Sequence, residues 1–293
     1  MKFGAIEQDQ LDGHNFSMPS DHSQTAAVLA AGNGNMNVHC GCAKWGRKEW
    51  IGTIYPEGTK DKDFLAEYVK HFNGIEMNTT FYSIKRENVE KWTEKAPPGF
   101  KFSPKFNRTV SHTRRLNEKA YDYLEYFMYA IEGFGEHLGP SFLQLPESFT
   151  SSNLDRLEQF AEYVPDDIDV FVEFRDASWF EGSAFDETFA MLAQYGLGAV
   201  ITDVGTRRDV LHQRLTIPKA FVRFNGYGLH PSDYQRMDDW IQRIKEWQQA
   251  GIEEVHWYAH QQDETDTPVT CDYFIKNLNK ACGLTIKRPD FIH

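Results

Sequence analysis

Short apolar runs recur along the chain from Val38 onward, and stretches with helical periodicity separate them. Runs of four to eight apolar residues predict buried strands, whose side chains alternate between two faces. Between the runs, apolar residues recur every three or four positions; in residues 151–164, Leu154, Leu157 and Phe160 form one such stripe. The pattern predicts eight strands, at residues 38–42, 74–78, 100–106, 141–145, 169–174, 198–203, 220–224 and 254–260.

Strands that alternate with helices are typical of βα units around a parallel sheet. A single closed TIM-like (β/α)8 barrel is the simplest arrangement for eight units, and about 250 residues suffice for one. We therefore expect an α/β fold with one barrel domain over residues 38–293. A doubly wound open sheet is the alternative. Residues 1–37 are polar, turn-rich and without clear periodicity, which sets them apart as an N-terminal extension.

Charged and polar side chains interrupt the predicted strands close to their C-terminal ends. Glu173 and Arg175, for example, are two residues apart and therefore point to the same side of their strand. In a barrel, one side faces the lumen, and active sites lie at the C-terminal ends of the strands. Because an unpaired buried charge is costly, we expect these side chains to pair or to face water in one shared pit. The members are Glu76, Asn78, Lys105, Gln144, Glu173, Arg175, Asp203, Arg223, Tyr258 and His260.

Two carboxylates in this group, Glu76 and Glu173, lie on the second and fifth predicted strands, nearly opposite each other in an eight-stranded ring. We expect them to act as general acid and base, with pKa values split by neighbouring cations. Such a pair also suits glycoside hydrolysis, although strands four and seven carry Gln144 and Arg223 instead of carboxylates. The alternative for Glu173 is a structural ion pair with Arg175.

The three cations of the group suit an anionic ligand. Arginine side chains bind carboxylate or phosphate groups through two parallel hydrogen bonds, so Arg175 and Arg223 favour an anionic substrate, held together with Lys105. Lys105 is also a candidate Schiff-base nucleophile if its pKa is depressed. The residues expected to orient the substrate are Asn78, Gln144 and Asp203, the last also a candidate catalytic group.

The loops that follow the strands carry further candidates. His112 follows the third strand and is either an acid–base group above the barrel mouth or an ordinary surface histidine. Aromatic residues beyond strand ends either stack on a sugar or base, or simply pack their loops. These aromatic residues are Trp45, Phe81, Tyr82 and Trp179.

A metal or organic cofactor is not expected. Glu76, Glu173, Asp203 and His260 include oxygen and nitrogen atoms that divalent ions accept as ligands. The lysine and arginines in the same space would repel a cation or neutralise these carboxylates first. A divalent-metal-dependent barrel enzyme therefore stays an alternative only.

The amino-acid composition limits the kinds of binding partner that we expect for this chain. The chain has 293 residues, of which 41% are hydrophobic, 25% charged and 14% aromatic, enough for one large core. Its net charge is −12, with 43 acidic against 31 basic residues, which disfavours general binding to nucleic acid or anionic membranes. No apolar run approaches the roughly 20 residues of a membrane span. Four cysteines without disulfide or zinc spacing favour reduced thiols and a cytoplasmic protein.

Several ordered motifs resemble one known family, the YecE-like proteins (domain of unknown function 72). They include "GCAKWGRKEWIGTIYP" at 41–56, "FNGIEMNTTFYSIKRENVEKWTEKAPPGFKFSPK" at 72–105, "SHTRRL" at 111–116 and "VEFRDASWF" at 172–180. The resemblance covers most of the chain from Val38 onward and implies a TIM-like barrel. The extension is similar to that of one branch of the family, which implies that it packs on the barrel. Residues 258–268 depart from the family's Asn-rich phrase, so the resemblance assigns no role to His260 or Gln261.

The resemblance supplies no reaction, so the expected function depends on the polar residues. We expect a metal-independent enzyme, a hydrolase or an isomerase or lyase, that acts on a small polar, anionic or sugar-like substrate at the C-terminal mouth. The alternative is a non-catalytic protein that binds a ligand or nucleic acid. The sequence does not indicate an oligomeric state.

Overall fold

The eight apolar runs form eight parallel strands in the computed structural model, which describes residues 3–292. Each strand lies within two residues of its expected position. Within the described residues the strands are β1 (Asn37–Cys42), β2 (Gly74–Met77), β3 (Lys101–Pro104), β4 (Ser141–Gln144), β5 (Val170–Glu173), β6 (Gly198–Val204), β7 (Lys219–Asn225) and β8 (Glu254–His260). The α-helices of the same part of the chain are α1 (Thr25–Ala30), α2 (Phe64–Tyr68), α3 (Arg86–Thr93), α4 (Tyr121–Ile131), α5 (Leu154–Tyr163), α6 (Gly182–Gln194), α7 (Pro231–Ala250) and α8 (Thr267–Cys282).

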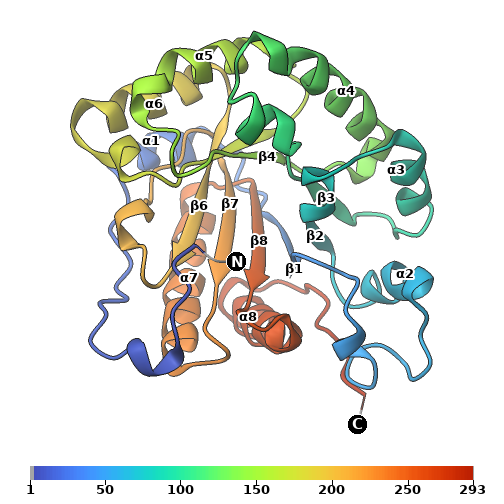
Figure 1. Ribbon diagram of the computed structural model, residues 1–293. Helices are drawn as coiled ribbons and strands as arrows, with labels where there is room; N and C mark the ends of the chain where they lie inside the picture. Colours follow the sequence, from blue (N-terminus) through green and yellow to red (C-terminus); the bar gives the residue numbers. More distant parts are fainter. Residues whose placement is uncertain (1–2, 293) are drawn as a thin grey trace.

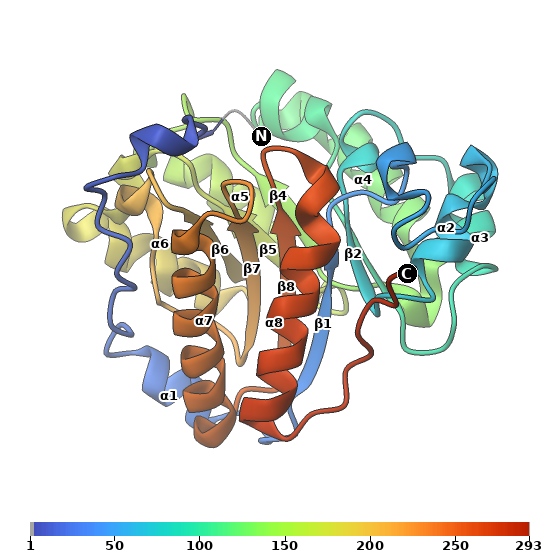
Figure 2. The same cartoon turned by 90° about the horizontal axis from the view of Figure 1, so that it is seen from below.

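The strands form a curled parallel sheet with helices outside it (Figure 1). Six strands are hydrogen-bonded in the order β1-β8-β7-β6-β5-β4, and β2 pairs with β3 in a separate two-stranded sheet. Helices α7 and α8 lie side by side across the outer face of β7 and β8 (Figure 2). The expected α/β class is confirmed, whereas a ring of eight continuously hydrogen-bonded strands is not.

Side chains bridge the gap between β1 and β2, where no backbone ladder forms in the described chain. Asn73 donates to the carbonyl of Val38 at 2.8 Å and accepts from the N–H of Cys40 at 2.8 Å. The hydroxyl of Tyr68 accepts from the N–H of Cys42 at 2.7 Å. Backbone groups of an edge strand that would otherwise be unpaired are therefore satisfied by side chains.

The gap between β3 and β4 is bridged by two backbone hydrogen bonds outside the strand ladders. The N–H of Phe106 donates to Phe142 at 3.0 Å, and the N–H of Gly139 donates to Phe102 at 2.8 Å. Bridging contacts thus join the two sheets at both junctions without a continuous ladder, and the strands curl around a shared interior, which we call the lumen.

We predict that Asn73→Ala lowers the free energy of unfolding by about 1–3 kcal/mol, because two backbone groups of β1 lose their partner. Urea denaturation measures this change. The matched control is Asn88→Ala, at an exposed position of α3, which should change the free energy by less than about 0.5 kcal/mol. Equal effects of the two substitutions would contradict the bridging role.

The first 37 residues contact the remainder of the chain at several points. Leu11 is buried, and the hydroxyl of Thr25 donates to the carbonyl of Gln213 at 3.0 Å. The indole N–H of Trp247 donates to Asp21 at 3.0 Å. Residues 1 and 2, and residue 293 at the other end, lie outside the described residues, and the boundary between extension and barrel at residue 37 stays a prediction.

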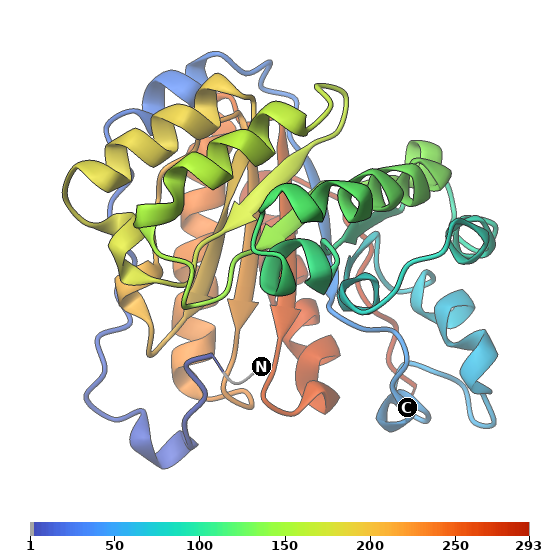
Figure 3. The ribbon, with the colours of Figure 1, turned by 45° about the horizontal axis from the view of Figure 1, so that its top comes forward.

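Three further features complete the description of the fold. The C-terminal segment returns to the loop before α2, where the N–H of Ile292 donates to Thr53 at 2.7 Å (Figure 3). All four cysteines are free, three of them buried. Among the described residues, no helix has both the length and the apolar character needed to cross a membrane.

Candidate active site

One layer of polar side chains fills the lumen near the C-terminal ends of the strands. They point inward because they occupy alternate positions on their strands. Their positions in the chain are far apart, yet hydrogen bonds join them into one network. The members are Glu76 and Asn78, Lys105, Gln144, Glu173 and Arg175, Thr202, Arg223 and His260.

Arg223 is the centre of this network. Its Nε and Nη2 donate to the two carboxylate oxygens of Glu76, both at 2.7 Å, and its Nη1 donates to Glu173 at 2.7 Å. The Arg223 side chain is 1% exposed and both carboxylates are fully buried. One guanidinium therefore holds two carboxylates from opposite sides of the lumen, with the paired hydrogen bonds that suit arginine.

Glu173 has no carboxylate oxygen left for a substrate. Its Oε1 accepts from Arg175 at 3.0 Å and from Thr202 at 3.1 Å, and its Oε2 accepts from Gln144 at 2.8 Å and from Arg223. Burial alone would raise the pKa of Glu173, but the guanidinium groups of Arg175 and Arg223 outweigh it and lower the pKa to about 2. A carboxylate held in this way is a weak base.

Glu76 is in a similar position. Its Oε1 also accepts from Asn78 at 2.7 Å, and its Oε2 lies 3.1 Å from Nε2 of His260. Although burial opposes ionisation, the charges of Arg223 and His260 hold the pKa of Glu76 well below its usual range. The acid–base role expected for this pair from the sequence stays a prediction; in the structure both carboxylates accept hydrogen bonds from Arg223 and have lowered pKa values.

Lys105 is a member of the network whose pKa is lowered to near neutral pH. Its ammonium group donates to Oε1 of Gln144 at 2.8 Å and lies 4.2 Å from the ring centre of Phe81. Burial lowers the pKa of Lys105 to about 7, and the positive charges of Arg223 and Arg175 act in the same direction. Near pH 7 a large fraction of this amine is neutral, as a nucleophile or general base requires.

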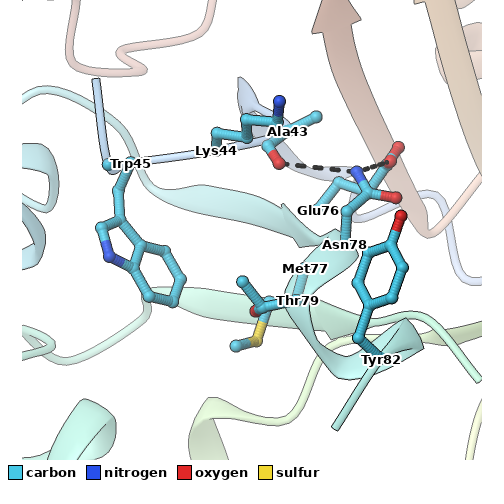
Figure 4. Close-up of a pocket in the computed structure, with 9 residues that line it drawn as sticks. Ala43, Lys44, Trp45, Glu76, Met77, Asn78, Thr79 and Tyr82 are labelled. Atoms are coloured by element: carbon cyan, nitrogen blue, oxygen red, sulfur yellow. Dashed lines mark hydrogen bonds between the residues drawn. The ribbon is translucent and has the colours of Figure 1, made fainter. Parts of the chain in front are cut away.

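A cavity with two lobes opens above this layer. The polar lobe, of about 300 Å³, is lined by Lys105, Gln144, Arg175, Arg223 and His260 among others. The second lobe, of about 250 Å³, is mostly apolar. Figure 4 shows Trp45 and Tyr82 on opposite sides of it, with Thr79 between them. The lobes share lining residues, namely Ala43, Lys44, Asn78 and Tyr82.

Asp203, expected in the pit, and Trp179, expected in a loop beyond a strand end, lie away from the cavity. Asp203 points away from the lumen, toward α7, where it accepts from Arg236 at 3.1 Å and from the indole of Trp240 at 2.7 Å. The lumen position on β6 belongs instead to Thr202. Trp179 is fully buried, and its indole donates to the carbonyl of Phe149 at 2.7 Å. Asp203 therefore anchors a helix and Trp179 packs the core.

His112 lies at the edge of the site. Its ring is half-buried against Phe81, with the ring centres 5.0 Å apart, and Nδ1 lies 2.9 Å from the hydroxyl of Ser111. Burial lowers the pKa of His112 to about 4, and the charges of Lys105 and Arg175 act likewise. The imidazole is neutral at pH 7, and it does not line either lobe of the cavity.

The structure brings His260, which the sequence predicted for the pit, to the site, and it adds lining residues that the sequence did not predict. His260 lines the polar lobe and contacts both Glu76 and Arg223. Lys44 and Glu264 line the same lobe from the loops after β1 and β8. The sequence signal for His260 is its position, because it is the last residue of an apolar run and points to the lumen side. Nothing local marks Lys44 or Glu264, because their place depends on how the loops converge.

Comparisons with known proteins agree with this fold. A family model described as "Protein of unknown function DUF72" matches residues 39–290. The chain is 26% identical to UPF0759 protein YecE of Escherichia coli K12 over 264 residues, covering 83% of this chain and 93% of that protein. It is 25% identical to UPF0759 protein YunF of Bacillus subtilis 168 over 243 residues, covering 72% and 84%.

Solved structures show the same architecture. A DUF72 family protein from Enterococcus faecalis V583 superposes with a TM-score of 0.69 at 16% identity, covering 88% of this chain and 98% of that one. One from Thermotoga maritima MSB8 superposes with a TM-score of 0.65 at 24% identity, covering 83% and 99%. The family match over most of the chain and the shared fold lead to one conclusion: this chain belongs to the DUF72 family.

Proposed function

We propose that this chain is an enzyme of the isomerase or lyase type, in which the amine of Lys105 attacks the carbonyl carbon of a small anionic substrate. The observation that carries this function is the placement of Lys105 on the wall of the polar lobe, between Gln144 and the face of Phe81. Attack by the neutral amine and loss of water would give an imine, which stabilises a neighbouring carbanion.

The surroundings of Lys105 support this role. A desolvated lysine beside other cations is a recognised arrangement for an amine nucleophile. Gln144 accepts from Lys105 and donates to Glu173, so the amine is oriented by a carboxylate without being paired to it directly. A direct ion pair would keep the amine protonated. Hydrolysis by a carboxylate pair is less well supported, since the oxygens of Glu76 and Glu173 are engaged with guanidinium groups.

The lining of the polar lobe favours an anionic, small substrate. Lys44, Arg175 and Arg223 line it together with Lys105, and Glu264 is the one acidic residue among the described residues of its wall. A volume of about 300 Å³ is at the lower end of small-molecule sites. We also propose that the eight strands form a TIM-like barrel. The cavity opens at the C-terminal ends of the strands, which is where such barrels have their active sites.

Reductive trapping tests the amine chemistry. The protein is incubated with pyruvate or with acetone, which share a ketone but differ in the carboxylate, and the imine is reduced with borohydride. We expect one adduct by intact mass, located on Lys105 by peptide mapping, and at least about tenfold more of it with pyruvate, because the arginines hold the anion. A wider panel of anionic aldehydes and ketones then defines the substrate class.

Two variants act as matched controls. Lys105→Met should abolish the adduct, whereas Lys44→Met, which removes the other lysine of the lobe, should keep it. Adducts spread over surface lysines and unchanged in Lys105→Met would overturn the role of this amine. If a ligand raises the melting temperature while no carbonyl compound is trapped, the non-catalytic binding function is favoured instead.

A further inference from the structure

Three potential metal ligands lie together near the N-terminal ends of β1 and β8, at the opposite end of the lumen from the cavity. They are His39, Glu254 and His256, each of which places one donor atom within 4.8 Å of the others. His39 and His256 are direct partners in the β1–β8 pairing, and Glu254 lies two residues before His256 on the same strand. Strand register, which is rigid, therefore positions all three.

An apolar layer separates this cluster from the candidate active site. It consists of Phe142, Phe171, Val200, Phe221 and Tyr258, which pack together inside the lumen and are buried. The ring of Phe221 stacks on that of His256, with centres 6.1 Å apart. The cluster is thus no part of the network around Arg223, and the chemistry at the mouth does not use it.

The donor atoms have the spacing of a small tetrahedral site. Oε1 of Glu254 lies 3.3 Å from Nε2 of His39 and 2.9 Å from Nε2 of His256. Zinc bonds to nitrogen and oxygen ligands of about 2.0–2.1 Å imply tetrahedral donor separations of roughly 3.3 Å. Of the three donor pairs, that of Glu254 with His39 already has this separation, and that of Glu254 with His256 needs to open by a few tenths of an ångström. The donor atoms of the two histidines lie within 4.8 Å of each other.

Hydrogen bonding at His39 indicates where a cation would be favourable. Its Nδ1 lies 3.3 Å from the carbonyl oxygen of Asn73, and its Nε2 faces the carboxylate of Glu254. Both neighbours are acceptors, but a neutral imidazole carries a single N–H. If Nδ1–H donates to Asn73, a lone pair on Nε2 faces a carboxylate oxygen. A metal ion between them turns this repulsion into two bonds.

The second histidine is similarly supported. Nδ1 of His256 lies 3.2 Å from the hydroxyl of Tyr258, which lies 2.8 Å from the hydroxyl of Ser103. Partners of this kind fix the tautomer and orientation of metal-binding histidines.

The charge of Glu254 is not balanced by a lysine or arginine in the described chain. Its ion-pair partners are the two histidines. Lys219, its neighbour across the β7–β8 pairing, bonds instead to Asp169 at 2.5 Å. The Glu254 side chain is 20% exposed, which leaves a route for an ion and for a water molecule as a fourth ligand.

We propose that His39, Glu254 and His256 bind one divalent transition-metal ion of the zinc class, with both histidines coordinating through Nε2 and Glu254 through a carboxylate oxygen. The ion would link β1 to β8 next to the gap that Asn73 bridges, as a structural clamp at the N-terminal ends of these strands. This site is independent of the function proposed for Lys105.

Metal titration tests the site directly. The full-length protein is treated with a chelator, dialysed, and titrated with Co²⁺, whose visible ligand-field bands report four-coordination, and then with Zn²⁺. We expect one equivalent of Co²⁺ to bind with the intense bands of a tetrahedral site, and Zn²⁺ to displace it and raise the melting temperature. Affinity should fall with decreasing pH, because protons compete for the imidazole nitrogens.

Glu254→Gln and His39→Gln should each weaken binding by more than about tenfold, because each removes a ligand. The matched control is Glu253→Gln, at the adjacent position, where the carboxylate accepts from the N–H of Asn33 at 3.0 Å instead of facing the cluster. It should bind as wild type does. Circular dichroism and melting of the metal-free variants check that they fold. Absence of stoichiometric uptake by wild type, or uptake unchanged in both ligand variants, would overturn the site.

Discussion

Arg223→Met is expected to lower the free energy of unfolding by about 3–5 kcal/mol, because it leaves two buried carboxylates without their shared cation. Methionine fills much of the volume of the arginine stem, so the loss reports charge more than packing. Guanidinium denaturation at pH 7 measures it. Arg288→Met, which removes an arginine from a pair with Asp272 at the surface, is the matched control and should cost less than about 1 kcal/mol.

The pH dependence of this loss has a definite sign. In wild type the pKa of Glu173 is lowered from 4.5 to about 2, so the stability that its ionised form provides is present above pH 4.5 and is lost as pH falls toward 2. In the variant, burial dominates and raises the pKa of the carboxyl groups, so the folded state takes up protons more readily. The difference between the two proteins should therefore begin to shrink above pH 4.5, where the folded variant takes up protons, and should go on shrinking toward pH 2. A constant difference from pH 7 to pH 4 is the contrary result.

Lys105 is expected to react with a neutral-amine reagent about 10³-fold faster at pH 7 than an equally accessible lysine of ordinary pKa. With a pKa of about 7, half of its amine is neutral at that pH, against about 0.04% for a pKa near 10.4. Competitive labelling with a trace of acetic anhydride, followed by peptide mass spectrometry, gives the rate for each lysine. The profile of Lys105 should rise with pH through a midpoint at about 7.

Arg175→Met provides the second arm of this experiment. Because the positive charge of Arg175 lowers the pKa of Lys105, its removal should move the midpoint to higher pH. Lys70, whose side chain is 57% exposed beside Glu67, serves as an internal reference. Its labelling rate reports how active the reagent is. A Lys105 midpoint near 10 in wild type would remove the basis for amine catalysis.

Much of the fold follows from local pattern. A strand that is buried on both faces must be apolar throughout, so its position is readable from a short window, and all eight strands were found in this way. The gaps in hydrogen bonding between the strands, in contrast, cannot be read from a local sequence pattern. Asn73 and Tyr68 bridge β1 and β2 from outside both strands, and no periodicity marks a side chain that satisfies a distant backbone.

The polar lumen could be predicted, because burying charged side chains in apolar strands costs free energy. The roles of the individual side chains could not be predicted. Asp203 lies one position from the lumen-facing Thr202, and hydrogen bonds from Arg208, Arg236 and Trp240 explain why a carboxylate is tolerated outside the lumen. Whether a buried carboxylate acts in catalysis or only holds its neighbours in place depends on how many hydrogen-bond donors surround it. That number comes from strands distant in the sequence.

The apolar layer across the middle of the lumen has a consequence for how this chain can change. Within residues 3–292, the guanidinium–carboxylate network above it and the imidazole cluster below it share no hydrogen-bond partner. Free energies of substitutions that lack common partners usually sum to within about 0.3–0.5 kcal/mol. Selection, or a protein engineer, can therefore rebuild one end without compensating at the other, which makes the two ends separable evolutionary modules within a single strand set.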